Sequence, residues 1–343
     1  MTADLLFSVL TGPRGDIGLI TLNRPRQLNA LTLSMCQQLT HHLQQWQSQA
    51  NIKAVIIQSA SERAFCAGGD IRSIYDAKDH PEVSQAFFRV EYQLNQLIHE
   101  FPKPYIALLD GIVMGGGLGI SVHGQYRVAT ANLRLAMPET GIGYFPDVGG
   151  SYFLPRCQHF MGWYLGLTGA TIDLASAYQA GLVNVVIETS AIQTFINTLQ
   201  EADWGMDPHL TTRTVLQTFH AAPAPTSDPH FFETCFNQLS LADILDQLAQ
   251  YPASIAHDTL HILQTRSPTS LKVTYEQLKR GAHLDFAACM QMEYTLCQHF
   301  LRQPDFYEGI RAAVVDKDRT PRWQPAELAQ ITSRYVQKYF LKA

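Results

Sequence analysis

Two carboxylates, Glu139 and Asp147, stand eight residues apart in a segment that is otherwise almost wholly apolar. Gly141, Gly143 and Pro146 separate them, so the segment favours a loop over a regular element. Paired acids in an apolar site can have their proton affinities pushed apart and act as base, nucleophile or general acid. The alternative for each acid is an N-cap or a solvated loop residue.

A third carboxylate, Glu91, interrupts the apolar stripe of a predicted helix at residues 84–100. Phe87, Leu94 and Ile98 recur there at helical spacing, and Glu91 lies on the same stripe. An acid at this point indicates a pocket. The alternative is a carboxylate at the edge of the stripe that reaches water or pairs with Lys or Arg.

Two glycine-rich turns follow strand-like segments and precede predicted helices. The first, AFCAGGD at residues 64–70, comes after KAVIIQS, and the second, MGGG at 114–117, comes after PYIALLDG. Glycine lets backbone approach a ligand closely, and free N–H groups at a helix start carry partial positive charge. Two such turns could converge on one developing oxyanion. The alternative is that both are ordinary strand-to-helix turns.

Other reactive residue types point to packing. His123 follows the second turn, but no Ser or Cys stands in a nucleophile-elbow context beside it, so a core or capping role is expected. Cys66 lies inside the first turn, where nothing in the sequence lowers its pKa. The six cysteines form no CxxC pair and no cluster with patterned histidines, which predicts neither a zinc site nor a disulfide framework.

These candidates are carried by alternating strand-like and helix-like segments, which is typical of an α/β protein. Strands are predicted at residues 15–23, 53–59, 102–111, 126–130 and 133–138, and helices at 33–46, 84–100 and 117–124. A linker rich in proline and small polar residues is predicted at 221–230, and everything after it looks helical. We therefore expect a strand-and-helix core over residues 1–195 and a mainly helical region over 196–343.

The composition excludes several classes of protein. With 46% hydrophobic and 16% charged among 343 residues, the chain is typical of a water-soluble globular protein. The net charge of −5, with dispersed basic residues, argues against nucleic acid as a partner. The apolar stretch at 105–123 contains Asp110 and a glycine run, which argues against a membrane span. The start of the sequence lacks the pattern of a secretory signal, so a cytoplasmic location is expected.

The motifs, in their order and spacing, resemble the crotonase superfamily, also called the enoyl-CoA hydratase/isomerase family. The resemblance rests on LNRPRQLNAL (22–31), AFCAGGDI (64–71), MGGG (114–117), AMPETGIGYFPDVGG (136–150) and AGLV (180–183). Three later stretches resemble a thioester-hydrolase subgroup of that superfamily: SPTSLK (267–272), MEYTL (292–296) and DFYEGIRAAVVDKDRTPRW (305–323). The resemblance extends over nearly the whole chain. It implies a spiral of ββα units that forms two nearly perpendicular sheets, followed by packing helices.

One position separates the hydratase pattern from the hydrolase pattern. The resemblance implies that hydratases use two glutamates, one shortly after the second glycine turn and one in the later loop. Here the first position is Gly119 and only the second acid, Glu139, is kept. A hydratase lacking half of its acid/base pair should lose about a hundredfold or more in rate. The hydrolase subgroup pairs the kept glutamate with the acid that corresponds to Asp147.

The resemblance also implies roles for single residues. The backbone N–H groups of Gly69 and Gly116 would stabilise the oxyanion, while Glu139 and Asp147 would carry the acid/base or nucleophilic chemistry. The substrate-binding residues implied are Ala67, Asp70, Glu91, Gly116, Glu139 and Asp147.

The expected activity is hydrolysis of a short branched β-hydroxyacyl-CoA thioester, preferably 3-hydroxyisobutyryl-CoA. The alternatives are an enoyl-CoA hydratase or isomerase that uses Glu139 alone, or a catalytically idle CoA-binding relative. No metal or cofactor is expected, because CoA enters as part of the substrate. The oligomeric state is left open between a homo-oligomer and a single chain. The resemblance favours a homo-oligomer, because crotonases commonly form trimers, but the C-terminal helices could cover the surface through which such trimers assemble. A bacterial cytosol is favoured over an organelle matrix.

Overall fold

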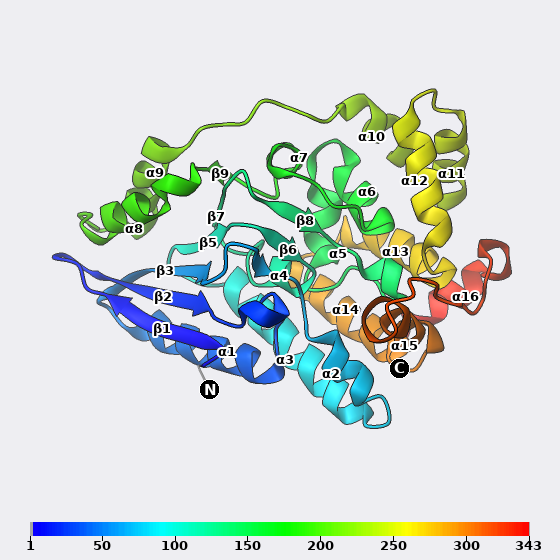
Figure 1. The fold of residues 1–343 in the computed structure, drawn as a ribbon, viewed down its shortest axis with the longest axis horizontal. Coiled ribbons are helices and arrows are strands. Elements are labelled where there is room, and N and C mark those ends of the chain that lie inside the picture. The colour runs from blue at the N-terminus through cyan, green and yellow to red at the C-terminus, as the bar shows by residue number, and fades with distance from the viewer. Residues whose placement is uncertain (1–2, 343) are drawn as a thin grey trace. The chain divides into compact units, whose positions relative to one another are not determined.

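The structure, a computed structural model, describes residues 3–342 (Figure 1). Contacts between residues group them into two compact units that interleave along the chain. The sheet unit comprises residues up to Gly69, Gln93–Leu135 and Ile172–Ser227, and the helical unit comprises Asp70–Tyr92, Ala136–Thr171 and the residues from Asp228 onward. The expected division at residue 195 stays a prediction, since this grouping follows contacts and not a single boundary in the sequence.

A six-stranded sheet, in the order β1-β2-β3-β5-β7-β9, forms the centre of the sheet unit (Figure 1). Its strands are β1 (Leu5–Leu10), β2 (Asp16–Leu22), β3 (Ile52–Ser59), β5 (Tyr105–Leu109), β7 (Tyr126–Ala129) and β9 (Val185–Val186). The β1–β2 pair is antiparallel and the other neighbours are parallel. The strands predicted at residues 15–23, 53–59, 102–111 and 126–130 are therefore confirmed.

A second, three-stranded sheet carries the glycine-rich turns. It consists of β4 (Ala64–Cys66), β6 (Ile112–Met114) and β8 (Arg134–Ala136), in the order β4-β6-β8. Strands β4 and β6 run parallel, so their carboxyl ends lie at the same edge. The turn that follows each strand therefore begins at that edge.

The sheet unit also contains helices. They are η1 (Pro25–Gln27), α1 (Leu33–Ser48), the part of α3 (Pro81–His99) from Gln93 onward, α4 (Gly116–Gly119), α7 (Leu174–Gln179), η5 (Thr189–Ala191), α8 (Ile192–Gln200) and α9 (Pro208–Phe219). Phe195 and Leu199 of α8 pack with Ile56 and Ile106 of the sheet in one buried core. The helix predicted at 33–46 is α1, and its apolar face buries Leu39, as the period of its sequence requires.

The helical unit contains the helices that carry the acids. They are α2 (Ile71–Asp76), the part of α3 (Pro81–His99) up to Tyr92, η2 (Glu139–Ile142), α5 (Gly150–Phe153), η3 (Leu154–Arg156), η4 (Gln158–Phe160), α6 (Met161–Thr168), α10 (Pro229–Phe236), α11 (Leu241–Gln250), α12 (Ser254–Thr265), α13 (Pro268–Gly281), α14 (Phe286–Phe300), α15 (Pro304–Ile310), the π-helix η6 (Arg311–Val315), η7 (Leu328–Gln330) and α16 (Ser333–Lys338). The prediction of a helical region after the linker is confirmed. None of the helices within residues 3–342 is long and apolar enough to span a membrane.

The linker predicted at 221–230 ends earlier than expected, because α10 begins inside it at Pro229. Asp228 caps this helix, since its side chain accepts a hydrogen bond from the N–H of His230. Proline is favoured at the first helical position, where its fixed φ suits the helix and no N–H is needed. The sequence DPH is therefore the start of a helix and not the end of the linker.

Asn29 fastens the loop after β2 to the strands that precede the first glycine turn. Its Nδ2 lies 2.8 Å from the hydroxyl oxygen of Ser59 and 2.9 Å from the carbonyl oxygen of Phe65. Its Oδ1 accepts a hydrogen bond of 2.8 Å from the N–H of Arg24. The residue is fully buried at a φ of 58°, a left-handed conformation that asparagine tolerates better than most residues.

We predict that Asn29→Asp lowers the free energy of unfolding by about 3 kcal/mol, because it puts a buried carboxylate against carbonyl oxygens. Denaturant unfolding followed by tryptophan fluorescence measures the shift. Asn51→Asp, in an exposed turn, is the matched control and should leave the midpoint nearly unchanged. Equal shifts for the two variants would contradict the assigned role of Asn29.

Candidate active site

The two glycine-rich turns meet within the sheet unit. A Cβ atom built on Gly117 would lie 2.3 Å from the carbonyl oxygen of Cys66, so only glycine allows this approach. A Cβ atom built on Gly68 would lie 3.8 Å from the amide nitrogen of Gly116. The convergence that the sequence analysis weighed against two ordinary turns is therefore present in the backbone.

Gly69 and Gly116 occupy different kinds of position in these turns. Gly116 is the first residue of α4, so its N–H lies outside the hydrogen-bond ladder of that helix. Gly69 forms an isolated β-bridge with Leu31, and the N–H of Leu31 donates to the carbonyl of Gly68. These contacts hold the first turn, but they do not test whether the two amides bind a substrate oxygen, which stays a prediction.

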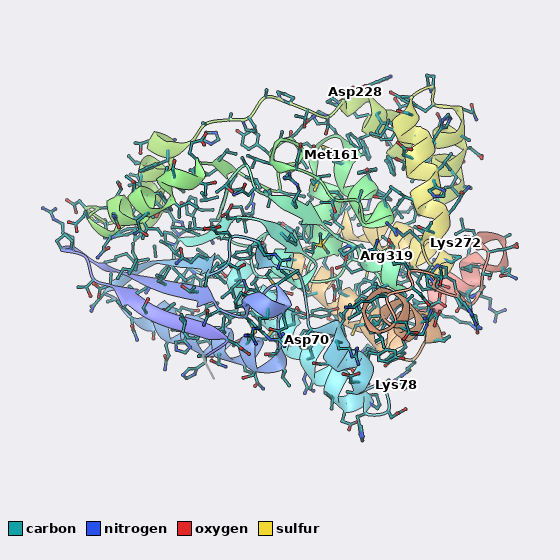
Figure 2. The ribbon with its side chains drawn as sticks, in the orientation of Figure 1. Asp70, Lys78, Met161, Asp228, Lys272 and Arg319 are labelled. Atoms are coloured by element: carbon teal, nitrogen blue, oxygen red, sulfur yellow. The ribbon has the colours of Figure 1, made fainter. Side chains whose placement is uncertain are left out.

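Ala67 and Asp70 already have structural partners at the first turn. The N–H of Ala67 donates a 3.0 Å hydrogen bond to the carbonyl of Leu28. Asp70, labelled in Figure 2, precedes α2. It caps this helix, because its side chain accepts a 3.3 Å hydrogen bond from the N–H of Ser73. A role for either residue in substrate binding stays a prediction.

The three sequence-predicted acids are buried in the helical unit. Glu91 on α3 is 2% exposed, Glu139 at the start of η2 is 6% exposed, and Asp147 in the following loop is 5% exposed. The alternative of solvated acids is therefore wrong for all three. Burial and the charges of Asp147 and Glu139 raise the pKa of Glu91 well above its ordinary value, so the three carboxyls form one electrostatic cluster.

Asp147 is held by a tyrosine. The hydroxyl of Tyr92 donates a 2.7 Å hydrogen bond to Oδ2 of Asp147 and lies 3.3 Å from the hydroxyl of Tyr144. Burial raises the pKa of Asp147 to about 7, although the hydrogen bond from Tyr92 opposes the rise because it favours the charged form. Asp147 can therefore change its protonation state close to neutral pH.

Glu91 and Glu139 each keep an oxygen without a protein partner. Oε1 of Glu91 and Oε2 of Glu139 are buried, and neither has a hydrogen-bond partner among the described residues. Burial, followed by the charge of Asp147, raises the pKa of Glu139 well above its ordinary value. Buried polar groups are nearly always satisfied in proteins, so two unsatisfied carboxyl oxygens in one cluster indicate a place for a polar ligand.

Sequence analysis missed a fourth buried acid, Glu293 on α14, which is fully buried. Its two carboxylate oxygens accept hydrogen bonds of 2.8 Å from the N–H groups of Gly149 and Ser151. Burial raises its pKa to about 8, against the effect of these bonds. Glu293 shares an apolar stripe with Leu296 and Phe300, which is the same signal that identified Glu91. We refer to Glu91, Glu139, Asp147 and Glu293 as the acid cluster.

Two further candidates from the sequence have packing roles. The thiol of Cys66 donates to the carbonyl of Asn29 at 3.1 Å, and His123 is 8% exposed with its ring 6.1 Å from that of His99. Both observations agree with the packing or capping roles that the sequence predicts for these residues. No group of three or more His, Cys, Asp or Glu residues suited to a metal ion occurs among residues 3–342.

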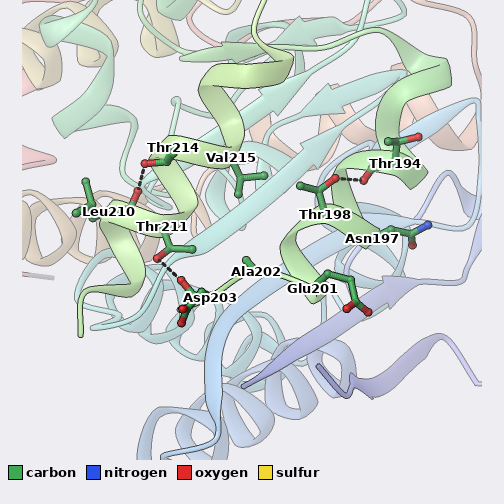
Figure 3. Close-up of a pocket in the computed structure, with 10 residues that line it drawn as sticks. All are labelled: Thr194, Asn197, Thr198, Glu201, Ala202, Asp203, Leu210, Thr211, Thr214 and Val215. Atoms are coloured by element: carbon green, nitrogen blue, oxygen red, sulfur yellow. Dashed lines mark hydrogen bonds between the residues drawn. The ribbon is translucent and has the colours of Figure 1, made fainter. Parts of the chain in front are cut away.

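A cavity of about 770 Å³ opens between α8 and α9 in the sheet unit (Figure 3). Thr194 and Thr198 line it from α8, and Thr211 and Val215 line it from α9. None of the sequence-predicted site residues borders this cavity.

We predict that Glu139→Gln stabilises the protein more at pH 8 than at pH 5. The folded-state pKa of Glu139 is raised, so the unfolded chain ionises first and stability falls as the pH rises above about 4.5. Each unit of the pKa difference costs about 1.4 kcal/mol, and glutamine removes this cost. Thermal unfolding at both pH values measures the gain. Glu62→Gln, at an exposed position, is the control, and equal gains at both pH values would contradict the prediction.

Comparison with known proteins shows the family to which the chain belongs. The family model described as "Enoyl-CoA hydratase/isomerase" matches residues 17–340. The chain is 40% identical to the human protein named 3-hydroxyisobutyryl-CoA hydrolase, mitochondrial, covering 98% of this chain and 89% of that protein. It is 41% identical to the protein of the same name from Dictyostelium discoideum, covering 97% of this chain and 91% of that protein.

Solved structures give the same assignment at the level of the fold. A carnitinyl-CoA dehydratase from Mycobacterium thermoresistibile is 35% identical with a TM-score of 0.91, over 100% of this chain and 97% of the other. An enoyl-CoA hydratase from Rhodobacter sphaeroides is 32% identical with a TM-score of 0.86, over 98% of this chain and 97% of the other. Matching in sequence over nearly its full length and in the course of its backbone, the chain belongs to the enoyl-CoA hydratase/isomerase family.

Proposed function

We propose that this protein hydrolyses the CoA thioester of a short branched β-hydroxy acid, with 3-hydroxyisobutyryl-CoA as the preferred substrate. The observation that carries the proposal is the burial of Glu139 and Asp147 in one acid cluster, with glycine at position 119. The hydratase pattern implied by the resemblance has a second glutamate at position 119, where the buried Gly119 of α4 supplies no side chain. The retained pair therefore favours ester cleavage over addition of water to a double bond.

In the proposed reaction, backbone amides stabilise the oxyanion. The N–H groups of Gly69 and Gly116 bind the thioester oxygen as negative charge develops on it, and each donor contributes roughly 3 kcal/mol to the transition state. Because the donors belong to the backbone, this contribution requires the tight approach of the two glycine turns and no particular side chain.

Glu139 provides the basic group. In its ionised form it either attacks the carbonyl carbon to form an anhydride or removes a proton from the water that attacks. In both routes the C–S bond breaks and CoA leaves as a thiol after taking up a proton. In the general-base route the attacking water supplies the second oxygen of the product acid. In the anhydride route that oxygen comes from Glu139, and water that attacks the carboxyl carbon of Glu139 replaces it. The raised pKa of Glu139 makes it a stronger base than a solvated carboxylate.

The remaining acids recognise the β-hydroxyl group of the substrate. Oε1 of Glu91, which has no partner among the described residues, accepts a hydrogen bond from that hydroxyl, and Asp147 orients it or assists the proton transfer. A substrate without the hydroxyl leaves these buried acceptors unpaired, and such a loss discriminates strongly between otherwise similar substrates.

The names of some relatives support hydrolysis as the activity, and the names of others support the alternative, a hydratase. The curated relatives at 40–41% identity are named hydrolases, whereas the solved relatives at 35% and 32% identity are named a dehydratase and a hydratase. The cytoplasmic location, the homo-oligomer and the absence of a cofactor all stay predictions. The names of the curated relatives assign those proteins to mitochondria.

A panel of acyl-CoA esters tests the proposal directly. We expect the purified protein to release thiol from 3-hydroxyisobutyryl-CoA at least about 100-fold faster than from isobutyryl-CoA, because only the first ester satisfies the buried acceptors. Thiol release is measured with a chromogenic thiol reagent, and hydration by loss of the enoyl absorbance of crotonyl-CoA. Glu139→Gln should lower thiol release by at least about 100-fold while binding of the ester persists.

Two results of this panel would overturn the proposal. If crotonyl-CoA is hydrated faster than any ester is cleaved, the protein is a hydratase in spite of Gly119. If Glu139→Gln retains most of its turnover, Glu139 is neither base nor nucleophile. Single-turnover reaction in ¹⁸O-labelled water separates the two routes, since only the anhydride route transfers label into Glu139.

We further predict that Tyr92→Phe moves the acidic limb of the kcat/KM profile to higher pH. Loss of the hydrogen bond from Tyr92 disfavours ionised Asp147, so the pKa of Asp147 rises from about 7 and less of the active form is present below it. The expected shift is about one pH unit or more. Tyr307→Phe removes a hydroxyl that donates to the carbonyl of Leu301 and is the matched control. Superposable profiles for Tyr92→Phe and wild type would refute the coupling.

A further inference from the structure

The loop that carries Asp147 has a backbone conformation that needs external support. Val148 and Gly149 adopt φ angles of 50° and 89°, two consecutive left-handed residues. This conformation costs glycine little, but it is strained for valine, whose side chain branches at Cβ. Such strain persists only where the surroundings hold the backbone in place. The residues from Pro146 to Ser151 are called the acid loop below.

Glu293 supplies that support on the C-terminal side of Asp147. Its two oxygens accept the N–H groups of Gly149 and Ser151, both at 2.8 Å, across 144 and 142 residues of sequence. These amides lie at the start of α5, where N–H groups have no partner within the helix. Glu293 therefore caps α5 from another helix and fixes Gly149 and Ser151, which lie shortly after Val148.

Gln277 on α13 supports the acid loop from its N-terminal side. Its Nε2 donates to the carbonyl of Pro146 at 2.6 Å and to the hydroxyl of Ser151 at 2.8 Å, and the residue is fully buried. Asp147 is thus bracketed, since the backbone before it is bound by Gln277 and the backbone after it by Glu293. Tyr92 then holds the Asp147 side chain itself.

The bonding of Glu293 distinguishes it from the other members of the acid cluster. Glu91 and Glu139 each keep an unpartnered oxygen, whereas both oxygens of Glu293 are occupied by backbone amides. An amide side chain cannot replace this arrangement, because glutamine would present an NH₂ group to one of the two N–H donors. Glutamine therefore does not reproduce the two hydrogen bonds that Glu293 accepts from the backbone.

We infer that Glu293 is a positioning residue that holds Asp147 at the angle needed to bind the β-hydroxyl of the substrate, with Gln277 as its counterpart. The inference rests on the proposed function for the role of Asp147. In this inference Glu293 does not contact the substrate. Glu293 therefore affects the reaction only through the position of Asp147.

A double-mutant cycle tests this dependence. Glu293→Gln should lower kcat/KM for 3-hydroxyisobutyryl-CoA by about 10- to 100-fold, the loss expected for one hydrogen bond to a charged group. The value for isobutyryl-CoA should change by less than about threefold, because that ester has no β-hydroxyl for Asp147 to bind. In an Asp147→Asn background, Glu293→Gln should have no further effect on either ester. Additive losses, or equal losses for both esters, would overturn the inference.

The matched control is Glu276→Gln on the same helix as Gln277. Glu276 pairs with Arg280 at a partly exposed position, and its described hydrogen bonds and ion pair are to Arg280 and Gln337, outside the acid loop. It should match wild type with both esters. If Glu293→Gln does not fold, Gln277→Ala replaces it in the cycle, since it removes the support on the other side of Asp147 and should show the same selective loss.

A measurement without substrate separates failure of the inference from failure of the proposed function. Amide hydrogen exchange, read by mass spectrometry on peptides covering the acid loop, should be slow in wild type and at least about tenfold faster in Glu293→Gln. Unchanged exchange would overturn the positioning role, whatever the activity. If wild type cleaves neither ester but exchange accelerates as expected, the proposed function fails and the structural part of the inference stands.

Discussion

The burial of several carboxylates in one place is the constraint on which the rest of the site depends. Removing Glu91, Glu139, Asp147 and Glu293 from water costs free energy, and their like charges add to that cost. No ion pair among the described residues involves any of the four. The protein offsets part of the cost with hydrogen bonds from Tyr92 and from backbone amides. Burial raises the pKa values of Glu139 and Asp147, which favours their protonated forms. Such an arrangement persists where it serves a function.

The acid cluster divides into acids that are held and acids that are available. Asp147 and Glu293 have protein donors at 2.7 and 2.8 Å, so their orientations are determined by the fold. Glu91 and Glu139 each leave one oxygen unpaired. This division suits a site in which the fold orients two of the carboxyls, while the unpaired oxygens of the other two bind the substrate. It also explains why stability and activity should respond in opposite directions to Glu139→Gln, since the same buried charge that destabilises the fold supplies the base.

The sheet unit contributes backbone geometry in place of side chains. The parallel pairing of β4 with β6 places both glycine turns at one edge, and the absence of a side chain on Gly117 lets the turns approach to contact. Asn29 stabilises the first turn, because its side chain donates a hydrogen bond to the carbonyl of Phe65. Because the amides at this edge belong to the main chain, their chemistry depends on register and close packing, which are properties of the whole sheet.

Local patterns in the sequence were enough to predict helices and strands and to indicate part of the candidate site. The alternation in residues 15–23 and the helical period of residues 33–46 identified β2 and α1, because both signals arise from neighbours in the chain. Glu91 was found because an acid on an apolar stripe is visible in one helix. Glu293 carries the same signal, but its partners Gly149 and Ser151 lie 144 and 142 residues away. A periodic pattern predicts that a side chain is buried and not which distant group it meets. Only the packing of α14 against α5 decided that this carboxylate binds the loop of Asp147, and only the tertiary structure divided the chain into interleaved units.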